Sequence, residues 1–376
     1  MNIYALGILF STKLLPLFYA ILGFGLLITI HECGHFLFCK LFNIHTPTFS
    51  IGMGPSIFQK KIGDTNFRLA IIPIGGYVEI AGMAEVGQGG QAHAYDISPR
   101  SFRSKPYWQR VLVLVGGILF NIFFAYMVFS VLYMTGMPVQ KEVALFVKKV
   151  KKEDMPLGIQ PGDRLLAVNN RRLHADPKIL YPALRKLAEE LSKKKGEAVE
   201  LRLLRGKKEL VISVPGSKNG SNLQRGLLAG ATVYPETIRV EYEKYSVFQA
   251  IKKGVAKTHE WVGKFLVSIK MLAFKRNIKD FGGPIMIVSQ SFQMAQQGLL
   301  LLLVFLAIIS INLAIINLLP IGALDGGQLL FETIEFIIRR PIPEIIRFSV
   351  NLLSWVLILG LILFLSYQDI LALILR

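Results

Sequence analysis

The feature that most constrains this chain is a long apolar segment that carries three ionisable side chains close together. The segment runs from about Leu14 to Phe38, which is enough to cross a bilayer, and it contains His31, Glu32 and His35. Ionisable groups are costly inside a membrane and are expected there where they serve a function. A signal peptide is the alternative, but no small-residue cleavage site follows the segment. We therefore expect a membrane helix with a functional site.

The spacing of these residues, His-Glu-x-x-His, suggests the chemistry of the site. On a helix, positions i and i+4 lie on one face, so His31 and His35 can direct both imidazoles at one metal ion. Glu32 would lie beside that ion. In this pattern the two histidines bind Zn²⁺ and the glutamate serves as the general base toward water.

The composition of the chain indicates a membrane protein. Hydrophobic residues make up 52% of its 376 residues, more than is usual in a soluble protein. We expect a polytopic α-helical membrane protein with about four transmembrane helices. They are placed in segments 1–40, 111–136, 298–335 and 348–376. The short basic loops, 40–110 and 339–347, then lie on one side, which the positive-inside rule makes cytoplasmic.

Region 41–110, between the first two spans, contains an unusually apolar stretch. Phe67–Ile80 consists of two short β-prone runs around Gly75 and Gly76, which predicts a hairpin with a tight turn at the two glycines. The stretch could be a small structural hairpin, or a strand edge that enters the membrane beside the site.

Residues 141–235 read as a water-soluble insert. A β-turn-β-helix-β-β order, with a short apolar strand after the turn and a helix near 178–193, predicts one small α+β domain. Segment 236–297 follows, and its first part reads as an amphipathic helix lying on the membrane surface.

Basic residues are concentrated in the same part of the chain. Between residues 141 and 280 there are 30 Lys and Arg against 15 Asp and Glu. This surplus fits either attraction to anionic lipid headgroups or a solvated surface. We do not expect nucleic-acid binding, because no aromatic-interleaved basic motif accompanies the charge.

A catalytic zinc site needs a third protein ligand, and the best-placed carboxylate elsewhere in the membrane portion is Asp325. It follows Pro320 and Gly322 in a segment that cannot continue the third helix. The alternative is that Asp325 caps the next helix. Asn121, in the second span, likewise has a structural alternative, a hydrogen bond to a neighbouring helix.

These motifs together resemble the site-2 proteases, and within them the RseP-type intramembrane metalloproteases. The resemblance rests on HECGH, on the GGILFN run ending at Asn121, on FGGPI at Phe281–Ile285 and on the run Asn317–Gly327. The insert resembles a PDZ domain. The similarity covers nearly the whole chain, and HECGH together with the Asn-x-x-Pro-x-x-x-Leu-Asp-Gly run is highly specific.

The resemblance implies roles for particular residues. The implied zinc ligands are His31, His35 and Asp325, and Glu32 would activate water. The positions associated with substrate handling are Asn121, Asn317 and, in the β-element that holds substrate as a strand, Gly75 and Gly76. One departure is that a single PDZ-like unit is visible, where the better-known members have two.

The expected function is a membrane zinc endopeptidase of the bacterial inner membrane. It would cut single-span membrane proteins, such as anti-sigma factors or signal-peptide remnants, within the lipid bilayer. The alternative from another class is a membrane metal transporter or metal-binding protein, which would need ligands along a path through several spans. A catalytically silent relative is a further alternative, against which the intact ligand set argues.

Overall fold

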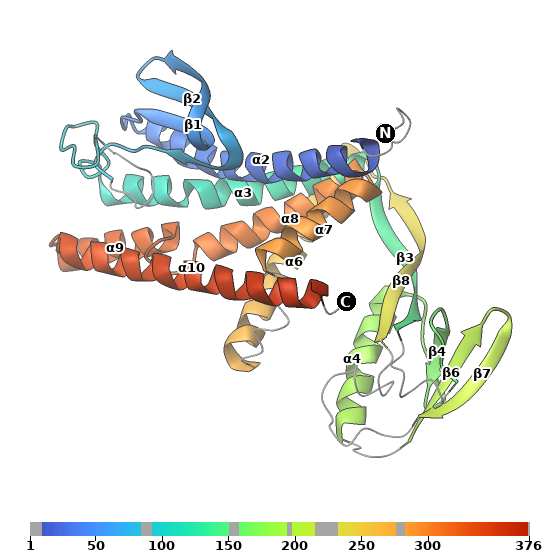
Figure 1. Ribbon diagram of the computed structural model, residues 1–376. Helices are drawn as coiled ribbons and strands as arrows, with labels where there is room; N and C mark the ends of the chain where they lie inside the picture. The colour runs from blue at the N-terminus through green and yellow to red at the C-terminus, as the bar shows by residue number, and fades with distance from the viewer. Residues whose placement is uncertain are drawn as a thin grey trace. The chain divides into compact units, whose positions relative to one another are not determined.

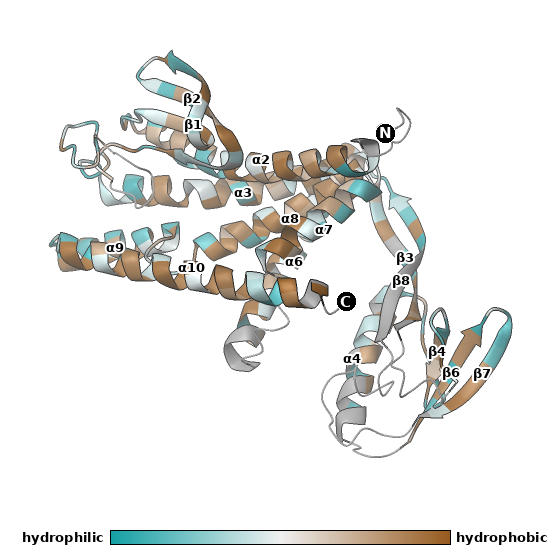
Figure 2. Ribbon diagram, viewed as in Figure 1, coloured by the Kyte–Doolittle hydropathy of each residue, from teal (hydrophilic) through white to brown (hydrophobic). Residues whose placement is uncertain are grey.

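The computed structural model describes residues 10–83, 92–149, 158–193, 198–214, 232–275 and 283–374. Among these residues, four helices are long and apolar enough to cross a membrane. They are Thr12–Leu41, Tyr107–Thr135, Leu299–Asn317 and Glu344–Leu371. Figure 2 shows the apolar character of these helices. The predicted multi-pass helical architecture is therefore confirmed.

The chain divides into two compact units, a helical unit of Met1–Thr135 and Lys244–Arg376 and an insert of Gly136–Glu243. The helical unit contains η1 (Phe10–Leu14), α2 (Leu15–Leu41), β1 (Thr48–Ile62), β2 (Thr65–Val78), α3 (Tyr107–Thr135), α6 (Val247–Lys275), α7 (Pro284–Gln297), α8 (Leu299–Asn317), α9 (Asp325–Ile338) and α10 (Glu344–Ile374) (Figure 1).

Helices α2 and α3 lie side by side and approach closely because glycines face each other. A Cβ added at Gly34 of α2 would collide with the backbone of Gly116 in α3, and one added at Gly116 would lie 2.7 Å from the Gly34 oxygen. A Cβ at Gly117 would lie 2.5 Å from atoms of both His31 and His35. Small residues of this kind let membrane helices pack backbone to backbone. The glycines therefore bring α3 directly against the two histidines.

The connection between α2 and α3 holds a hairpin, but the predicted turn at Gly75 and Gly76 is wrong. The chain reverses at Gly63, and both later glycines lie inside β2. Residues 48–51 of β1 pair with residues 66–69 of β2 and also with residues 76–78. Gly75 has a positive φ of 98°, which glycine adopts easily, so β2 can bend and return to β1. The second part of β2 thus becomes an edge beside α2.

A tight loop joins α8 to α9. Asn317 is the last residue of α8, and Asp325 is the first of α9. A Cβ at Gly326 or Gly327 would collide with backbone atoms of the loop. The two glycines therefore let the loop fold directly over the first turn of α9, which fixes where Asp325 emerges.

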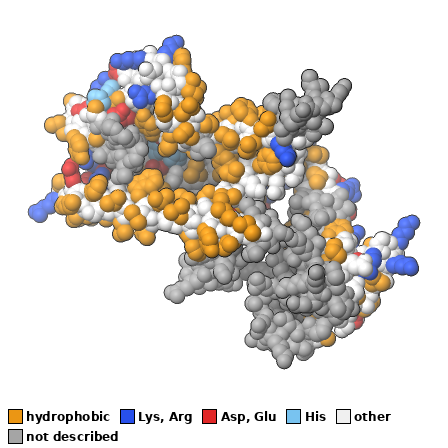
Figure 3. All heavy atoms as spheres, viewed as in Figure 1, with side chains coloured by type: hydrophobic (Ala, Val, Ile, Leu, Met, Phe, Trp, Pro, Cys, Tyr) orange, Lys and Arg blue, Asp and Glu red, His pale blue; other side chains and the backbone are white. Residues whose placement is uncertain are grey.

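The other helices of this unit also pack through close contacts. On α6, Gly254 lies against Ser130 of α3. Asp369 of α10 accepts hydrogen bonds from the backbone N–H groups of Gly283 and Met286, both at 2.9 Å, at the start of α7. Hydrophobic side chains cover the face of α10 seen in Figure 3. Phe281 and Gly282 of the FGGPI segment lie outside the described residues.

The insert is built around one sheet with strand order β7-β6-β4-β3-β8, and β5 pairs with β4. Its elements are β3 (Met137–Lys149), β4 (Arg164–Val168), β5 (Arg171–Arg172), α4 (Pro177–Lys193), β6 (Val199–Arg205), β7 (Lys208–Val214) and β8 (Thr232–Glu243). The sequence analysis missed β8, which pairs with β3 from the opposite end of the insert. Parts of the insert, 150–157, 194–197 and 215–231, lie outside the described residues.

Candidate metal centre

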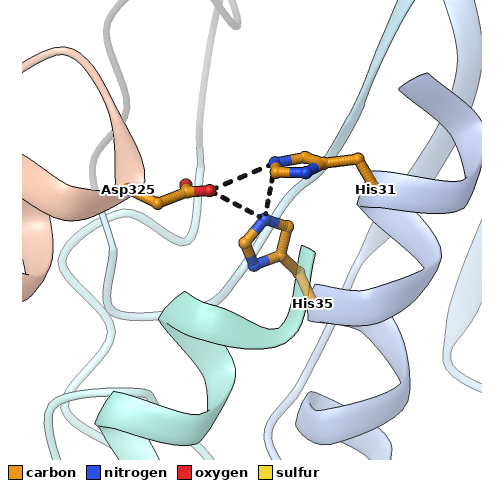
Figure 4. Close-up of side chains that lie close together, drawn as sticks. All are labelled: His31, His35 and Asp325. Carbon is orange, nitrogen blue, oxygen red and sulfur yellow. Dashed lines mark hydrogen bonds and ion pairs between the residues drawn. The ribbon is translucent and has the colours of Figure 1, made fainter. Parts of the chain in front are cut away.

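Three side chains from two distant parts of the chain converge at one point. His31 and His35 project from the same face of α2, and Asp325 projects from the first turn of α9 (Figure 4). Asp325 Oδ2 lies 3.1 Å from His31 Nε2 and 3.6 Å from His35 Nε2, and the two Nε2 atoms lie 3.2 Å apart. Both histidines are 7% exposed, so water competes little for these atoms.

The other nitrogen of each imidazole contacts α3. His35 Nδ1 lies 2.8 Å from the carbonyl oxygen of Val113, and because a carbonyl only accepts, Nδ1 must carry the proton. His35 Nε2 then keeps its lone pair for a metal. Helix α3 therefore sets the tautomer of His35, as groups around metal ligands commonly do.

Asn121 can set the tautomer of His31, as the Val113 carbonyl does for His35. The side chain is fully buried, and its Nδ2 lies 3.1 Å from His31 Nδ1, while its Oδ1 has no hydrogen-bond partner. The two amide atoms exchange places when the amide turns over. Oδ1 can then accept from His31 Nδ1–H, which satisfies the buried oxygen and leaves His31 Nε2 free to bind a metal. Asn121 also packs between helices, since Ser310 of α8 donates to its backbone carbonyl at 2.9 Å.

Asn317 lies beside His31. Its Nδ2 is 3.3 Å from His31 Nε2, and the side chain is half-buried. Its position at the end of α8 places an amide next to the ligand atoms.

Glu32 lies between α2 and the edge of β2. Glu32 and Val78 line one cavity, and a Cβ at Gly76 would lie 3.8 Å from the Glu32 Cγ. The structure therefore brings Gly76 to the centre. Gly75 contacts Met53 of β1 instead, where an added Cβ would lie 2.9 Å from the Met53 side chain.

A cavity of about 120 Å³ opens onto the three converging residues and Glu32. Its walls come from the hairpin, from the loop before α9 and from α10. The apolar part of the lining includes Val78, Ile80, Met83, Leu114, Leu324 and Trp355. This volume is enough for water and for part of a polypeptide segment.

The donor set fits a zinc ion. Two imidazole nitrogens and a carboxylate oxygen, all within 4.8 Å of one another, match the three protein ligands of a catalytic zinc site, and the adjoining cavity leaves room for a fourth ligand. Asp325 does not cap α9, because Leu324 holds the cap position and no side chain caps it. Within the described residues, these three form the one group of at least three potential ligands, whereas the transporter alternative requires ligands along a path.

Sequence reading missed a charge cluster beside this centre. Glu332 of α9 is 2% exposed and pairs with Arg110 of α3 and Arg347 of α10. The available signal was a glutamate two helical turns after Asp325, within an apolar stretch. The partners could not be identified, because they lie far away in the chain.

Comparison with known proteins agrees with this geometry. The model of the family described as peptidase family M50 matches residues 19–361. A protein of Clostridium perfringens is 33% identical over 354 residues, which cover 94% of this chain and 97% of the relative. A protein of Helicobacter pylori is 30% identical over 91% of this chain and 97% of its own length, and one of Clostridium acetobutylicum is 29% identical over 93% and 96%. All three are named "Putative zinc metalloprotease".

Proposed function

This chain belongs to peptidase family M50 and is a multi-pass membrane zinc metalloendopeptidase, and we propose that it cuts single-span membrane proteins within the bilayer. In this proposal His31, His35 and Asp325 hold Zn²⁺ and Glu32 is the general base. The observation that carries it is the convergence of the three ligand atoms at a membrane helix, with Glu32 beside them.

Each residue of the site has a separate role in the proposed reaction. When bound, Zn²⁺ supplies Lewis acidity to the scissile carbonyl and to the attacking water. The Glu32 carboxylate takes the proton from that water and later gives it to the amide nitrogen that leaves. Asn121 keeps His31 Nε2 available as a ligand atom, because its side-chain oxygen can accept a hydrogen bond from His31 Nδ1–H. The amide of Asn317 lies 3.3 Å from His31 Nε2, and we propose that it donates a hydrogen bond to a substrate carbonyl.

The edge of β2 is the proposed binding place for the substrate backbone. A transmembrane substrate arrives as a helix whose backbone groups are paired internally, and hydrolysis needs an extended segment. Unwinding leaves backbone donors and acceptors unpaired, at a cost of about 2–7 kcal/mol each in an apolar site. Residues 76–78 form a strand beside Glu32, so adding the substrate as a further strand would pair those groups.

The hairpin also has a surface suited to the membrane. Exposed apolar side chains gather around its bent middle part, and they belong to Ile51, Met53, Ile57, Phe58, Leu69, Ile71 and Ile72. An exposed apolar patch of this kind is expected to meet lipid or a partner. We therefore propose that the hairpin inserts into the membrane surface, where a substrate helix can reach it.

We propose a bacterial inner membrane location, with substrates such as anti-sigma factors or signal-peptide remnants that another protease has already trimmed. The insert, a β-rich unit with one long helix, α4, is proposed to act as a PDZ-like filter against substrates with bulky extracytoplasmic domains.

The test of this function is the substitution Glu32→Gln, which keeps the shape of the side chain but removes the base. Co-expression with candidate single-span proteins should give a cleavage product with wild type and lose at least about 100-fold of it with Glu32→Gln, because a positioned general base contributes about 10²–10⁴-fold. Glu260→Gln, on the exposed face of α6 between Lys257 and Lys264, is the matched control and should cleave normally. Cleavage by Glu32→Gln at the wild-type rate would refute the assigned role. Metal uptake that depends on the ligands, without cleavage, would favour the transporter alternative.

A further inference from the structure

We propose that the cluster of Arg110, Glu332 and Arg347 is a positioning device that holds Asp325 in its ligand geometry. The inference rests on the proposed zinc site and adds residues that do not touch it. It concerns how the ligand on α9 is kept in register with the two ligands on α2.

Both oxygens of the Glu332 carboxylate are used. Arg110 Nη1 of α3 donates to Oε2, while Arg347 of α10 donates to Oε1 from Nη1 at 3.3 Å and from Nη2 at 3.2 Å. The two arginine side chains are 17% and 18% exposed and that of Glu332 is 3%. Removing one member of such a buried group leaves a charge without compensation, which is strongly destabilising. The cluster therefore fixes the mutual placement of three helices tightly.

The cluster can act on Asp325 because α9 connects them. Glu332 follows Asp325 by seven residues, close to two helical turns, so the two side chains lie on nearly the same face of one rigid helix. The end of α9 that carries Asp325 has no side-chain cap of its own. The backbone of the preceding loop packs on Gly326 and Gly327 and holds this end locally. The ion pairs of Glu332 hold the helix further along, against α3 and α10, and set the direction of its axis.

Helix α3 positions all three proposed ligands through its contacts. It contacts His35 through the Val113 carbonyl and His31 through Asn121. The first turn of the same helix carries Arg110, which holds α9 through Glu332. Helix α3 therefore contacts both histidines and holds the helix that carries Asp325, although the three proposed ligands lie on α2 and α9.

A second contact joins the first turn of α3 to α9. The Tyr107 hydroxyl lies 3.0 Å from Thr333 Oγ1, and the Tyr107 ring stacks on Phe336 with centroids 4.3 Å apart. Both contacts follow Glu332 in the α9 sequence, the first at the next residue and the second one helical turn further. The ion pair and the Tyr107 contacts together hold α9 against α3. Removing the ion pair should therefore tilt α9 and displace Asp325.

The experiment measures metal binding in the full-length protein. Purified wild type, Glu332→Gln and Glu335→Gln are titrated with Zn²⁺ against a chromophoric chelator, and their Co²⁺ forms are compared by visible absorption. Glu335 is the matched control because it lies on the same helix and pairs with Arg347 at 2.8 Å but makes no contact with Arg110. We expect Glu332→Gln to lose about 10–100-fold in zinc affinity and to change the Co²⁺ spectrum, as supporting residues of metal sites commonly do. Glu335→Gln should keep both properties.

Arg110 supplies a second variant pair in case Glu332→Gln fails to fold. Arg110→Lys keeps a charged donor and should retain most of the zinc affinity, whereas Arg110→Met should lose it. Wild-type affinity and spectrum in Glu332→Gln, or in Arg110→Met, would overturn the inference. Equal losses in Glu332→Gln and Glu335→Gln would also overturn it, because they would indicate general destabilisation. These measurements need no substrate, so a wild type that binds zinc without cleaving would refute the proposed function and leave this inference standing.

Discussion

Asp325 of the helical unit and Asp163 of the insert follow similar turns in the sequence but have opposite surroundings. Each comes after a glycine-containing turn, IGALD in one case and QPGD in the other. Asp163 receives Arg205 Nε at Oδ1 and Arg205 Nη2 at Oδ2, both at 2.8 Å, and the Gln160 backbone N–H at Oδ2, also at 2.8 Å. Asp325 directs Oδ2 at two imidazole nitrogens.

The difference separates a structural carboxylate from the carboxylate that we propose as a zinc ligand. The charge of Asp163 is balanced by a guanidinium that grips both oxygens, so the group needs nothing further. Asp325 Oδ2 faces the Nε2 atoms of two imidazoles whose Nδ1 atoms contact α3, and a bound cation would satisfy all three ligand atoms at once. Asp163 is buried and Asp325 is half-buried, and the set of partners distinguishes the two.

The largest effect is expected from Asp325→Ala. Zinc should be bound more than about 100-fold less tightly, which exceeds the usual loss from a supporting residue, because a ligand itself is removed. Cleavage should be lost with it. The measurement is metal content after dialysis, together with chelator competition. Asp163→Ala is the control and should retain one Zn²⁺ per chain; full retention by Asp325→Ala would remove that residue from the ligand set.

An intermediate effect is expected from Asp163→Asn. The amide keeps the shape but loses the charge facing Arg205, so the insert should lose about 2 kcal/mol of unfolding free energy. The value lies below that for a fully buried pair because the Arg205 side chain is 35% exposed. Hydrogen exchange of the insert amides in the full chain measures this, while zinc affinity should stay unchanged. Undiminished protection of β4 and β6 would show that the pair contributes little.

The smallest effect is a pH dependence of the insert. Burial raises the pKa of Asp163, but the hydrogen bond from Arg205 and the N–H of Gln160 outweigh it and hold the pKa below its usual range. A carboxyl with a lowered folded-state pKa stabilises fully above its unfolded pKa, about 4, and loses that contribution as the pH falls through the folded value. Exchange protection of the insert should therefore fall on acidification below about pH 4.

Asp163→Asn supplies the control for that titration. The variant has no carboxyl at this position, so its insert should show a weaker acid dependence than wild type over the same range. Identical profiles for the two proteins would assign the acid sensitivity to other groups.

The sequence by itself determined the features that depend on neighbouring residues. The helical spacing of His31 and His35, with Glu32 between them, follows from the local periodicity of one segment. The four spans follow from the free energy of burying apolar side chains in lipid, which is a property of each segment alone. Asp325 was selected as the proposed third ligand because a zinc site needs one and few carboxylates lie in apolar surroundings.

Only the tertiary structure decided the features that depend on partners far away in the chain. The reversal of the hairpin at Gly63, the contact of Asn121 with His31 and the pairing of Glu332 with Arg110 each join segments whose own patterns are compatible with several partners. A glycine pair permits a tight turn but also a bent strand, and a buried asparagine or glutamate requires a partner without specifying which. Packing selects among these possibilities, because each buried polar group must find its partner at the same time as the apolar faces meet.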